Sequence, residues 1–225
     1  LPMFNTGYAD KDGNIFFVYN AKIPKRDDRY NWHELLAGDE QANIWTSYVP
    51  FDSLPQVLNP PDGFLQNCNS NPYLATGNTA DVSKPLPDWT GIETHQTNRA
   101  LRALETFGDD SSITREEFFK YKYDKKYSSH STLAKVRDRF IQDLTKEKTP
   151  EFQEALELIR NWNLSADSTN KAAALSMIVL PNSFNEDNLK YDIVNIKKKL
   201  RETIDFLINH FGRIDVPLGK ALRLV

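Results

Sequence analysis

The sequence predicts a mixed α+β protein in which the strands come first and the helices follow. Residues 1–92 hold most of the chain's twelve prolines, together with short β-branched and aromatic runs that are typical of strands and turns. Residues 93–225 carry apolar side chains at the 3.6-residue period of amphipathic helices. Strands and helices do not alternate, which argues against a parallel doubly wound sheet. We therefore expect a strand- and turn-rich part over 1–92 and a mainly helical part over 93–225.

The first predicted element is a β-hairpin between Phe4 and Tyr19. Aromatic and β-branched side chains lie on either side of the turn sequence DKDGN. Within that turn, Asp12-Gly13 supplies the positive φ that a tight connection requires. Ile23-Pro24 is expected to end the second strand, because proline cannot donate a hydrogen bond to a neighbouring strand.

Prolines and glycines divide the rest of the first part into short pieces. Residues 32–36 are predicted to form one helical turn, closed by Gly38. Residues 44–49 and 64–68 are predicted to be short strands, because both are rich in apolar side chains and both are followed by turn residues.

The second part contains clear helix signals. Thr114 and Glu117 have the spacing of a capping box, and Thr149-Pro150 places an N-cap residue before a proline at the first helical position. The clearest apolar stripe covers residues 193–211 and is ended by Gly212. We expect about six helices, at 101–107, after 114, and at 133–144, 150–162, 170–180 and 193–211.

The overall composition excludes several classes of protein. A chain with net charge −3 lacks the basic footprint of a nucleic-acid-binding protein, so we predict no nucleic-acid partner. The basic run 197–199 lies inside an amphipathic pattern and is interpreted as a solvated helix face. The longest apolar-rich run, 172–180, is far shorter than the roughly 20 residues of a spanning helix, so we predict no membrane span.

The short motifs of well-known catalytic sites are absent from the sequence. It contains no G-x-S-x-G, H-E-x-x-H or C-x-x-C and no glycine-rich phosphate loop, so we predict no zinc site, no nucleotide site and no cofactor. The histidines at 33, 95, 130 and 210 are interpreted as structural or solvated. Cys68 lies in an apolar run without a neighbouring base and is interpreted as an inert packing residue.

The segment GFLQNCNSNP, residues 63–72, is unusual because side-chain amides crowd the end of an apolar run. Side-chain amides can cap and turn the chain, and that role alone accounts for Asn71-Pro72. They can also donate a fixed N–H to a developing oxyanion, as asparagine does in some hydrolases. The residue types leave both interpretations open for the four amides of this segment, Gln66, Asn67, Asn69 and Asn71.

This segment also carries a resemblance to a known family. NPPDGFLQNCNSNPY resembles the stretch around the oxyanion asparagine of penicillin acylases and acyl-homoserine-lactone acylases. Four more segments resemble that family in the same order along the chain: GYADKDGNIFFVYNAKIPKRDDRYNW, IWTSYVPFDSLPQVLNPP, TNRALRALE and FGRIDVP. Each segment alone is weak evidence, but the five in this order span nearly the whole chain. The residues of these segments resemble the homoserine-lactone and aculeacin acylase branch more than penicillin G acylase.

The resemblance implies an N-terminal-nucleophile hydrolase with a four-layer αββα sandwich. This chain would contribute strands to the sandwich, a β-rich excursion around Trp45 and a helical lobe. In this family a precursor cleaves itself, and the new β-chain begins with a serine whose own α-amino group acts as base. A backbone N–H and an asparagine side chain hold the oxyanion. The chain corresponds to a middle portion of the β-chain and begins with Leu1, so we expect it to be inactive alone.

The same resemblance implies two catalytic-site residues in this chain. Asn69 matches the oxyanion asparagine, and Arg99 is the candidate for the arginine that supports it from the following helix. The penicillin G branch places its arginine about one helical turn earlier, where this chain has Gln96. That branch also binds calcium, partly through an aspartate near the position of Asp81. Because the other ligands would come from chain outside this sequence, we predict no metal.

The function implied is hydrolysis of the amide bond of N-acyl substrates, of the acyl-homoserine-lactone, β-lactam or lipopeptide type. The expected partners are the small-molecule substrate and the remaining α- and β-chain segments of the same precursor. A periplasmic or secreted location is implied by the resemblance only. The alternative is a non-catalytic helical interaction module or an inactive fragment, because the chain shows no nucleophile of its own.

Overall fold

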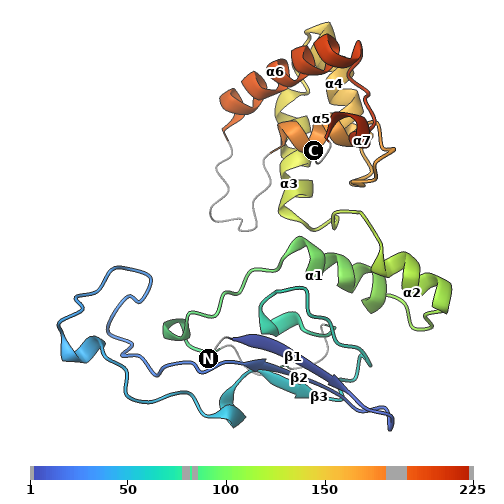
Figure 1. Ribbon diagram of the computed structural model, residues 1–225. Coiled ribbons are helices and arrows are strands. Elements are labelled where there is room, and N and C mark those ends of the chain that lie inside the picture. Colours follow the sequence, from blue (N-terminus) through green and yellow to red (C-terminus); the bar gives the residue numbers. More distant parts are fainter. Residues whose placement is uncertain (1–2, 78–81, 83–85, 181–191, 223–225) are drawn as a thin grey trace. The chain divides into compact units, whose positions relative to one another are not determined.

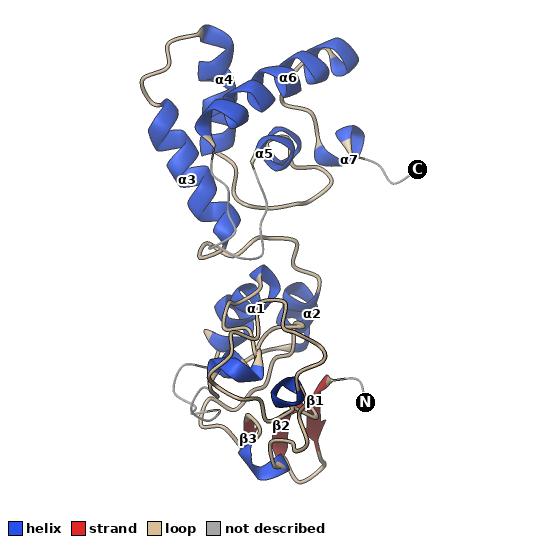
Figure 2. Ribbon diagram, turned by 90° about the vertical axis from the view of Figure 1, so that its left-hand side faces the viewer, coloured by secondary structure: helices blue, strands red, loops and turns tan. Residues whose placement is uncertain are grey.

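The computed structural model describes residues 3–77, 82, 86–180 and 192–222 (Figures 1 and 2). Contacts within the chain divide it into two compact units, Leu1–Ser112 and Ile113–Val225. The described residues form one three-stranded sheet and seven α-helices, which confirms the predicted α+β class. Helix α1, Asn98–Ala103, belongs to the first unit, and the domain boundary that the composition suggests near residue 92 stays a prediction.

The second unit is helical, as the apolar period predicts. Its capping box is present, since Glu117 N donates to Thr114 Oγ1 at 3.2 Å and Thr114 N donates to Glu117 Oε2 at 2.9 Å. Thr149 occupies an N-cap position but its side chain accepts no cap bond. The helices are α2 (Arg115–Lys122), α3 (Thr132–Leu144), α4 (Pro150–Arg160), α5 (Ala173–Val179), α6 (Ile193–Phe211) and α7 (Leu218–Ala221).

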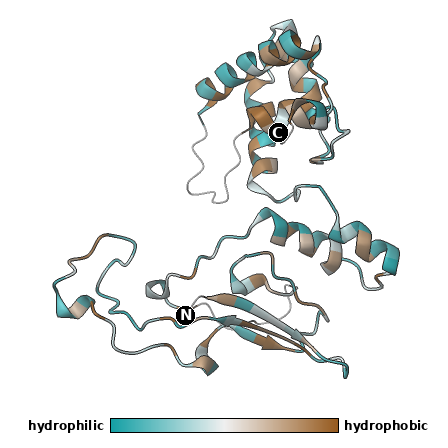
Figure 3. Cartoon of the chain, in the orientation of Figure 1, coloured by the Kyte–Doolittle hydropathy of each residue, from teal (hydrophilic) through white to brown (hydrophobic). Residues whose placement is uncertain are grey.

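The helices of this unit bury one apolar face each. Helix α5 packs against α4, α6 and α7, and all seven of its residues except Met177 and Ile178 are fully buried. Figure 3 shows that the helices carry both hydrophobic and hydrophilic faces. The side chains that lie deepest in this core include those of Phe140, Leu156, Trp162, Leu175 and Leu200. Among the described helices, none has the length and hydropathy that crossing a membrane requires.

The first unit is built on an antiparallel sheet with the order β1-β2-β3. Strands β1 (Phe4–Ala9) and β2 (Ile15–Asn20) form the predicted hairpin, with Phe4 opposite Asn20 and Ala9 opposite Ile15. Strand β3 (Gln56–Leu58) pairs with the other edge of β2. Strand β3 could not be predicted from the sequence, because its three residues are too few to show an alternating pattern.

Strand β2 is the centre of the first unit, because its neighbouring side chains point to opposite faces of the sheet. Phe17 packs in one small cluster with Ala75 and Val82, and the next residue, Val18, packs in another. Both faces of β2 are therefore covered by chain from the loops. Leu65, which lies in the amide-rich segment 63–72, packs against the first of these clusters, so the sheet supports the segment that the sequence singles out.

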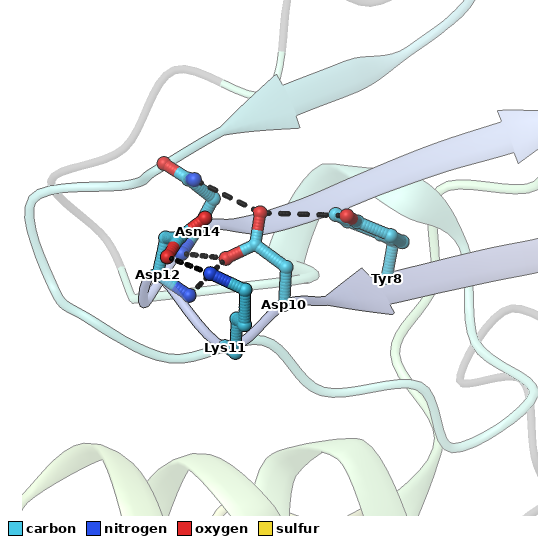
Figure 4. A network of polar contacts seen from close by, with 5 residues as sticks. All are labelled: Tyr8, Asp10, Lys11, Asp12 and Asn14. Atoms are coloured by element: carbon cyan, nitrogen blue, oxygen red, sulfur yellow. Dashed lines mark hydrogen bonds and ion pairs between the residues drawn. The ribbon is translucent and has the colours of Figure 1, made fainter.

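Asp10 closes the hairpin turn (Figure 4). Its Oδ1 accepts hydrogen bonds from the backbone N–H groups of Asp12 and Asn14, both at 2.9 Å, and its Oδ2 accepts one from Asn14 Nδ2 at 2.9 Å. Gly13 adopts a φ of +86°, as the turn sequence predicts. The hydrogen bonds from Asn14 are the main reason that the pKa of Asp10 lies below its usual value.

We expect Asp10 to stabilise the hairpin at neutral pH but not in acid. Its pKa is lowered by folding, so its contribution is complete above the unfolded pKa near 3.8 and disappears as the pH falls through the lower folded value. Asp10→Ala should unfold at a lower urea concentration than the unmodified chain at pH 7. The difference between the two urea midpoints should become smaller below about pH 3. Lys11→Ala changes an exposed neighbour in the same turn and should unfold like the unmodified chain throughout. If the difference between the midpoints of Asp10→Ala and the unmodified chain stays constant down to pH 2, the Asp10 charge does not stabilise the hairpin.

Three predicted elements of the first unit are wrong. Residues 32–36 form turns and no helix: Asn31 Oδ1 accepts from His33 N at 3.1 Å, and the one turn closed by Glu34 N to Asn31 O at 3.1 Å does not continue among the described residues. Residues 44–49 form only an isolated bridge between Tyr48 and Pro24. Two backbone bonds flank Pro24 in this bridge, from Val49 N to Ile23 O at 2.8 Å and from Lys25 N to Ser47 O at 2.9 Å, and the pairing does not continue into a ladder.

The third error is the strand predicted at residues 64–68, which is an extended loop. Within the described part of the chain, the one backbone–backbone hydrogen bond from residues 64–68 to another segment runs from Gln66 N to Ala75 O at 2.7 Å. The partner is therefore a tight turn just beyond the loop, not a second strand. The apolar residues Phe64 and Leu65 are partly buried, which explains why the sequence resembles a buried strand there.

Candidate functional site

The amide-rich loop folds back on itself through two of its four amides. Gln66 is 9% exposed, and its Nε2 donates to Leu74 O at 2.6 Å. Asn71 caps the short 3₁₀ turn Pro72–Leu74 by accepting from Tyr73 N at 3.0 Å. Its Nδ2 donates to His95 O, which joins the loop to the chain that leads into α1. Gln66 and Asn71 therefore act as turn and capping residues.

Asn69 differs from these two amides. It is exposed, and its backbone is in the left-handed region at φ +55°. Its side-chain oxygen, Oδ1, accepts a hydrogen bond from Arg99 Nη2 at 2.8 Å. Among the described residues, this is the single hydrogen bond of the Asn69 side chain. The two residues that the sequence analysis selected for the site therefore lie in direct contact.

Arg99 fixes the direction in which the Asn69 amide points. A guanidinium has donors only, so the amide must present its oxygen to Arg99 and its Nδ2 hydrogens elsewhere. Arg99 Nη2 also donates to Cys68 O at 3.1 Å, which holds the guanidinium against the loop backbone. Arg99 itself sits in the first turn of α1, where Thr97 Oγ1 accepts from Ala100 N at 3.2 Å and caps the helix. A capped helix thus supports the asparagine.

Asn5 and Asn67 hold the loop from the other side. Asn67 Oδ1 accepts from Asn69 N at 3.2 Å and from Asn5 Nδ2 at 3.0 Å. Asn5 Nδ2 also donates to Ser70 O at 3.0 Å. Asn5 belongs to β1, so the loop around Asn69 is bound to the sheet as well as to α1.

Gln96, one helical turn before Arg99, bonds a different amide of the loop. Its Nε2 donates to Asn71 Oδ1 at 3.0 Å, and its Oε1 is buried without a hydrogen-bond partner in the described part of the chain. In this chain, the cation beside Asn69 therefore comes from Arg99.

Cys68 and His95 take part in this arrangement through their backbone carbonyl oxygens. Burial raises the pKa of the Cys68 thiol, and the nearby Arg99 charge only partly offsets this effect, so the thiol stays protonated at neutral pH. His210 Nδ1 lies 2.8 Å from Phe206 O, one turn back in α6. Asp81 lies outside the described residues. Within the described ranges, no three His, Cys, Asp or Glu side chains gather as metal ligands would.

Asn5 was not among the residues predicted from the sequence, and Asn67 had no assigned role. One signal for Asn5 is available, since asparagine is disfavoured in strands and Asn5 lies inside β1. No local pattern predicts that a residue 62 positions away would meet Asn67. The contact depends on the path of the loop across the sheet.

The comparisons with known proteins agree on one family. The family model for penicillin amidase matches residues 1–212. Over 97 residues, or 43% of the chain, the sequence is 26% identical to the penicillin acylase 2 proenzyme of Pseudomonas sp. (strain SE83), of which the match covers 11%. Over 68 residues, or 30% of the chain, it is 32% identical to penicillin G acylase of Escherichia coli, of which the match covers 8%.

A solved structure extends the likeness to the whole fold. The thermostable penicillin G acylase from Alcaligenes faecalis is matched over 96% of this chain, with a TM-score of 0.60 and 16% sequence identity. At that identity the likeness shows the fold alone. The match covers 48% of that structure's chain, so this chain spans about half of it. Because the family model matches nearly every residue, the chain belongs to the penicillin amidase family.

Proposed function

We propose that the whole protein is an acylase that hydrolyses the amide bond of N-acyl substrates, of the acyl-homoserine-lactone, β-lactam or lipopeptide type. Membership of the penicillin amidase family supports an amide hydrolase. The observation that carries the assignment of the site is the pair formed by Asn69 and Arg99. An asparagine whose oxygen is held by an arginine presents its N–H group outward as a fixed hydrogen-bond donor.

In this proposal, an N-terminal serine from another segment of the precursor attacks the carbonyl carbon of the substrate amide. The serine's α-amino group takes the hydroxyl proton as the C–O bond forms, and a pair of electrons moves onto the carbonyl oxygen. Asn69 Nδ2–H and one backbone N–H stabilise that oxyanion. The electron pair then returns, the C–N bond breaks and the proton passes to the leaving amine. Water hydrolyses the acyl ester and releases the carboxylic acid.

The remaining segments of the precursor are the proposed partners of this chain. Strand β1 forms one end of the sheet, and within the described residues it pairs only with β2. Its Phe4 and Tyr8 are 64% and 54% exposed, which is unusual for large apolar and aromatic side chains on a sheet. In the proposed αββα sandwich, other strands of the α- and β-chains extend the sheet here. A periplasmic or secreted location is part of the same proposal.

The test of this function is amine release from a panel of N-acyl substrates by the processed, full-length protein. The panel holds acyl-homoserine lactones, acylated β-lactams and an acylated lipopeptide, each with its free amine as the standard. We expect at least one class to be hydrolysed, and the best substrate then identifies the branch of the family. If no N-acyl amide is turned over, the acylase proposal is wrong and the interaction-module alternative replaces it.

We expect Arg99→Ala to lower kcat by about tenfold to a hundredfold, because Asn69 Oδ1 loses its donor and the amide is free to turn. Arg99→Lys keeps the positive charge but not the planar guanidinium with its several N–H donors. Its kcat should therefore lie between that of Arg99→Ala and that of the unmodified protein. Arg102→Ala, on the same helix, is the matched control, because that residue bonds Glu105 and leaves Asn69 untouched. Equal kcat values for Arg99→Ala and Arg102→Ala would contradict this role.

A further inference from the structure

The side chain of Asn5 binds the loop on both sides of Asn69. Its Nδ2 donates to Asn67 Oδ1 and to Ser70 O, each at 3.0 Å. These acceptors belong to the residue two positions before Asn69 and to the residue directly after it. One amide group on β1 thus brackets the proposed oxyanion donor.

Two backbone groups fix which way these amides point. Ser70 O is a carbonyl oxygen and requires a donor, so Asn5 must present its Nδ2 to it. Asn69 N is a donor and requires an acceptor, so Asn67 must present its Oδ1. Turning either amide would place two acceptors or two donors in contact. The direction of the hydrogen bonds therefore follows from the chemistry of the backbone.

The backbone of Asn69 needs such support. At φ +55° it lies in the left-handed region, which is unfavourable for a residue with a side chain, although asparagine is among the more tolerant. Such a conformation persists only where the surrounding contacts impose it. Here the bond from Asn69 N to Asn67 Oδ1 imposes it, and Asn5 holds Asn67 in place.

Asn5 is well placed for this task and poorly explained by stability alone. It lies inside β1, opposite Tyr19 of β2, so its own backbone is fixed by the sheet. Its Oδ1 is buried and has no hydrogen-bond partner among the described residues. A buried unpaired oxygen is unfavourable, as is asparagine in a strand. The favourable contribution of Asn5 therefore comes from its Nδ2, which donates to Asn67 Oδ1 and Ser70 O.

We propose that Asn5 is a positioning residue for Asn69: it holds the loop so that the Asn69 amide stays aligned with the oxyanion. This inference rests on the proposed acylase function. Asn5 acts through Asn67 and Ser70 and touches no substrate in this scheme. Its loss should therefore lower kcat and leave KM nearly unchanged, because a displaced donor weakens the transition state more than substrate binding.

The decisive variant is Asn5→Asp in the processed, full-length protein, because it keeps the shape and replaces the donor with an oxygen. We expect kcat to fall by about tenfold to a hundredfold at pH 8, with KM within about twofold. At lower pH the introduced carboxyl becomes protonated and can donate again, so the ratio of variant to unmodified kcat should rise as the pH falls. Asn5→Leu removes the donor at every pH and should show no such recovery.

Two further measurements separate positioning from general damage. Thr6→Ala changes the next residue of β1, which is exposed and alternates to the other face, and it should keep full activity. In an Asn69→Ala background, Asn5→Asp should lower kcat no further, because residues that act as a unit are not additive. The same fold-loss in both backgrounds would overturn the proposal, as would unchanged kcat for Asn5→Asp alone.

The role of Asn5 can still be tested if one of these variants does not fold or if Asn69→Ala stays active. If Asn5→Leu does not fold, Asn5→Asp and its pH dependence decide. If Asn69→Ala keeps full activity, the proposed role of Asn69 is wrong and a crystal structure of Asn5→Asp then decides on Asn5. Loss of the left-handed backbone at Asn69 and of its bond to Arg99 would support positioning. An unchanged loop would overturn it.

Discussion

Asn69→Ala should lower the kcat of the processed protein by about a hundredfold to a thousandfold, the usual loss for one oxyanion donor. The variant removes the one side-chain amide of the loop that Arg99 aligns, with its Nδ2 directed away from the guanidinium. KM should change little, because the interaction forms as charge develops on the carbonyl oxygen. The measurement is single-substrate kinetics of amine release on the best substrate of the panel.

The main complication is that alanine also replaces a left-handed residue. Asn59 provides a matched control, because it too is a left-handed asparagine in the first unit, at φ +48°. Asn59→Ala should cost stability, since its Oδ1 accepts from Ile15 N at 2.8 Å, but it should not lower kcat. Asn69→Gly adds a second control, because glycine tolerates this backbone while lacking the amide. Full activity in Asn69→Gly would show that Asn69 is only a turn residue.

The sequence predicted those parts of the fold that depend on local chemistry. The hairpin turn at Gly13, the capping box of α2 and the stop of α6 at Gly212 are all set by residues within a few positions of one another. The helical stripes were equally predictable, because one buried face repeats along each helix. The elements that failed, at 32–36, 44–49 and 64–68, are those in which side chains or single bridges replace regular backbone pairing.

The candidate site also contains residues that the sequence predicted and residues that it could not predict. Asn69 and Arg99 were selected from a resemblance in sequence, and the structure brings them to 2.8 Å of each other, although their catalytic roles stay proposals. Asn5 could not be selected, because its contacts depend on how the loop crosses β1. The resemblance implied that the penicillin G branch has its arginine one helical turn earlier, at the position of Gln96 in this chain. Its bond to Asn71 assigns Gln96 to loop support instead.

In the second unit, Trp162→Ala should lower the free energy of unfolding by about 3–5 kcal/mol, the usual cost of emptying a large aromatic site in a core. Trp162 is 1% exposed and packs edge-on against Tyr127, with ring centroids 6.1 Å apart. Its Nε1 also donates to Ser165 O at 2.9 Å, so the truncation leaves that carbonyl without its donor. Urea unfolding, followed by circular dichroism of the helices, measures the change.

Two variants show which part of that loss is due to packing. Trp162→Phe keeps most of the volume but not the N–H, so it should cost only about 1–3 kcal/mol, the penalty for the unpaired carbonyl and a small cavity. Trp45→Ala removes a tryptophan that is 46% exposed and should cost clearly less than Trp162→Ala. If Trp162→Ala unfolds no more easily than Trp45→Ala, the helical unit does not depend on this core. The second unit would then need contacts beyond the described residues to stay folded.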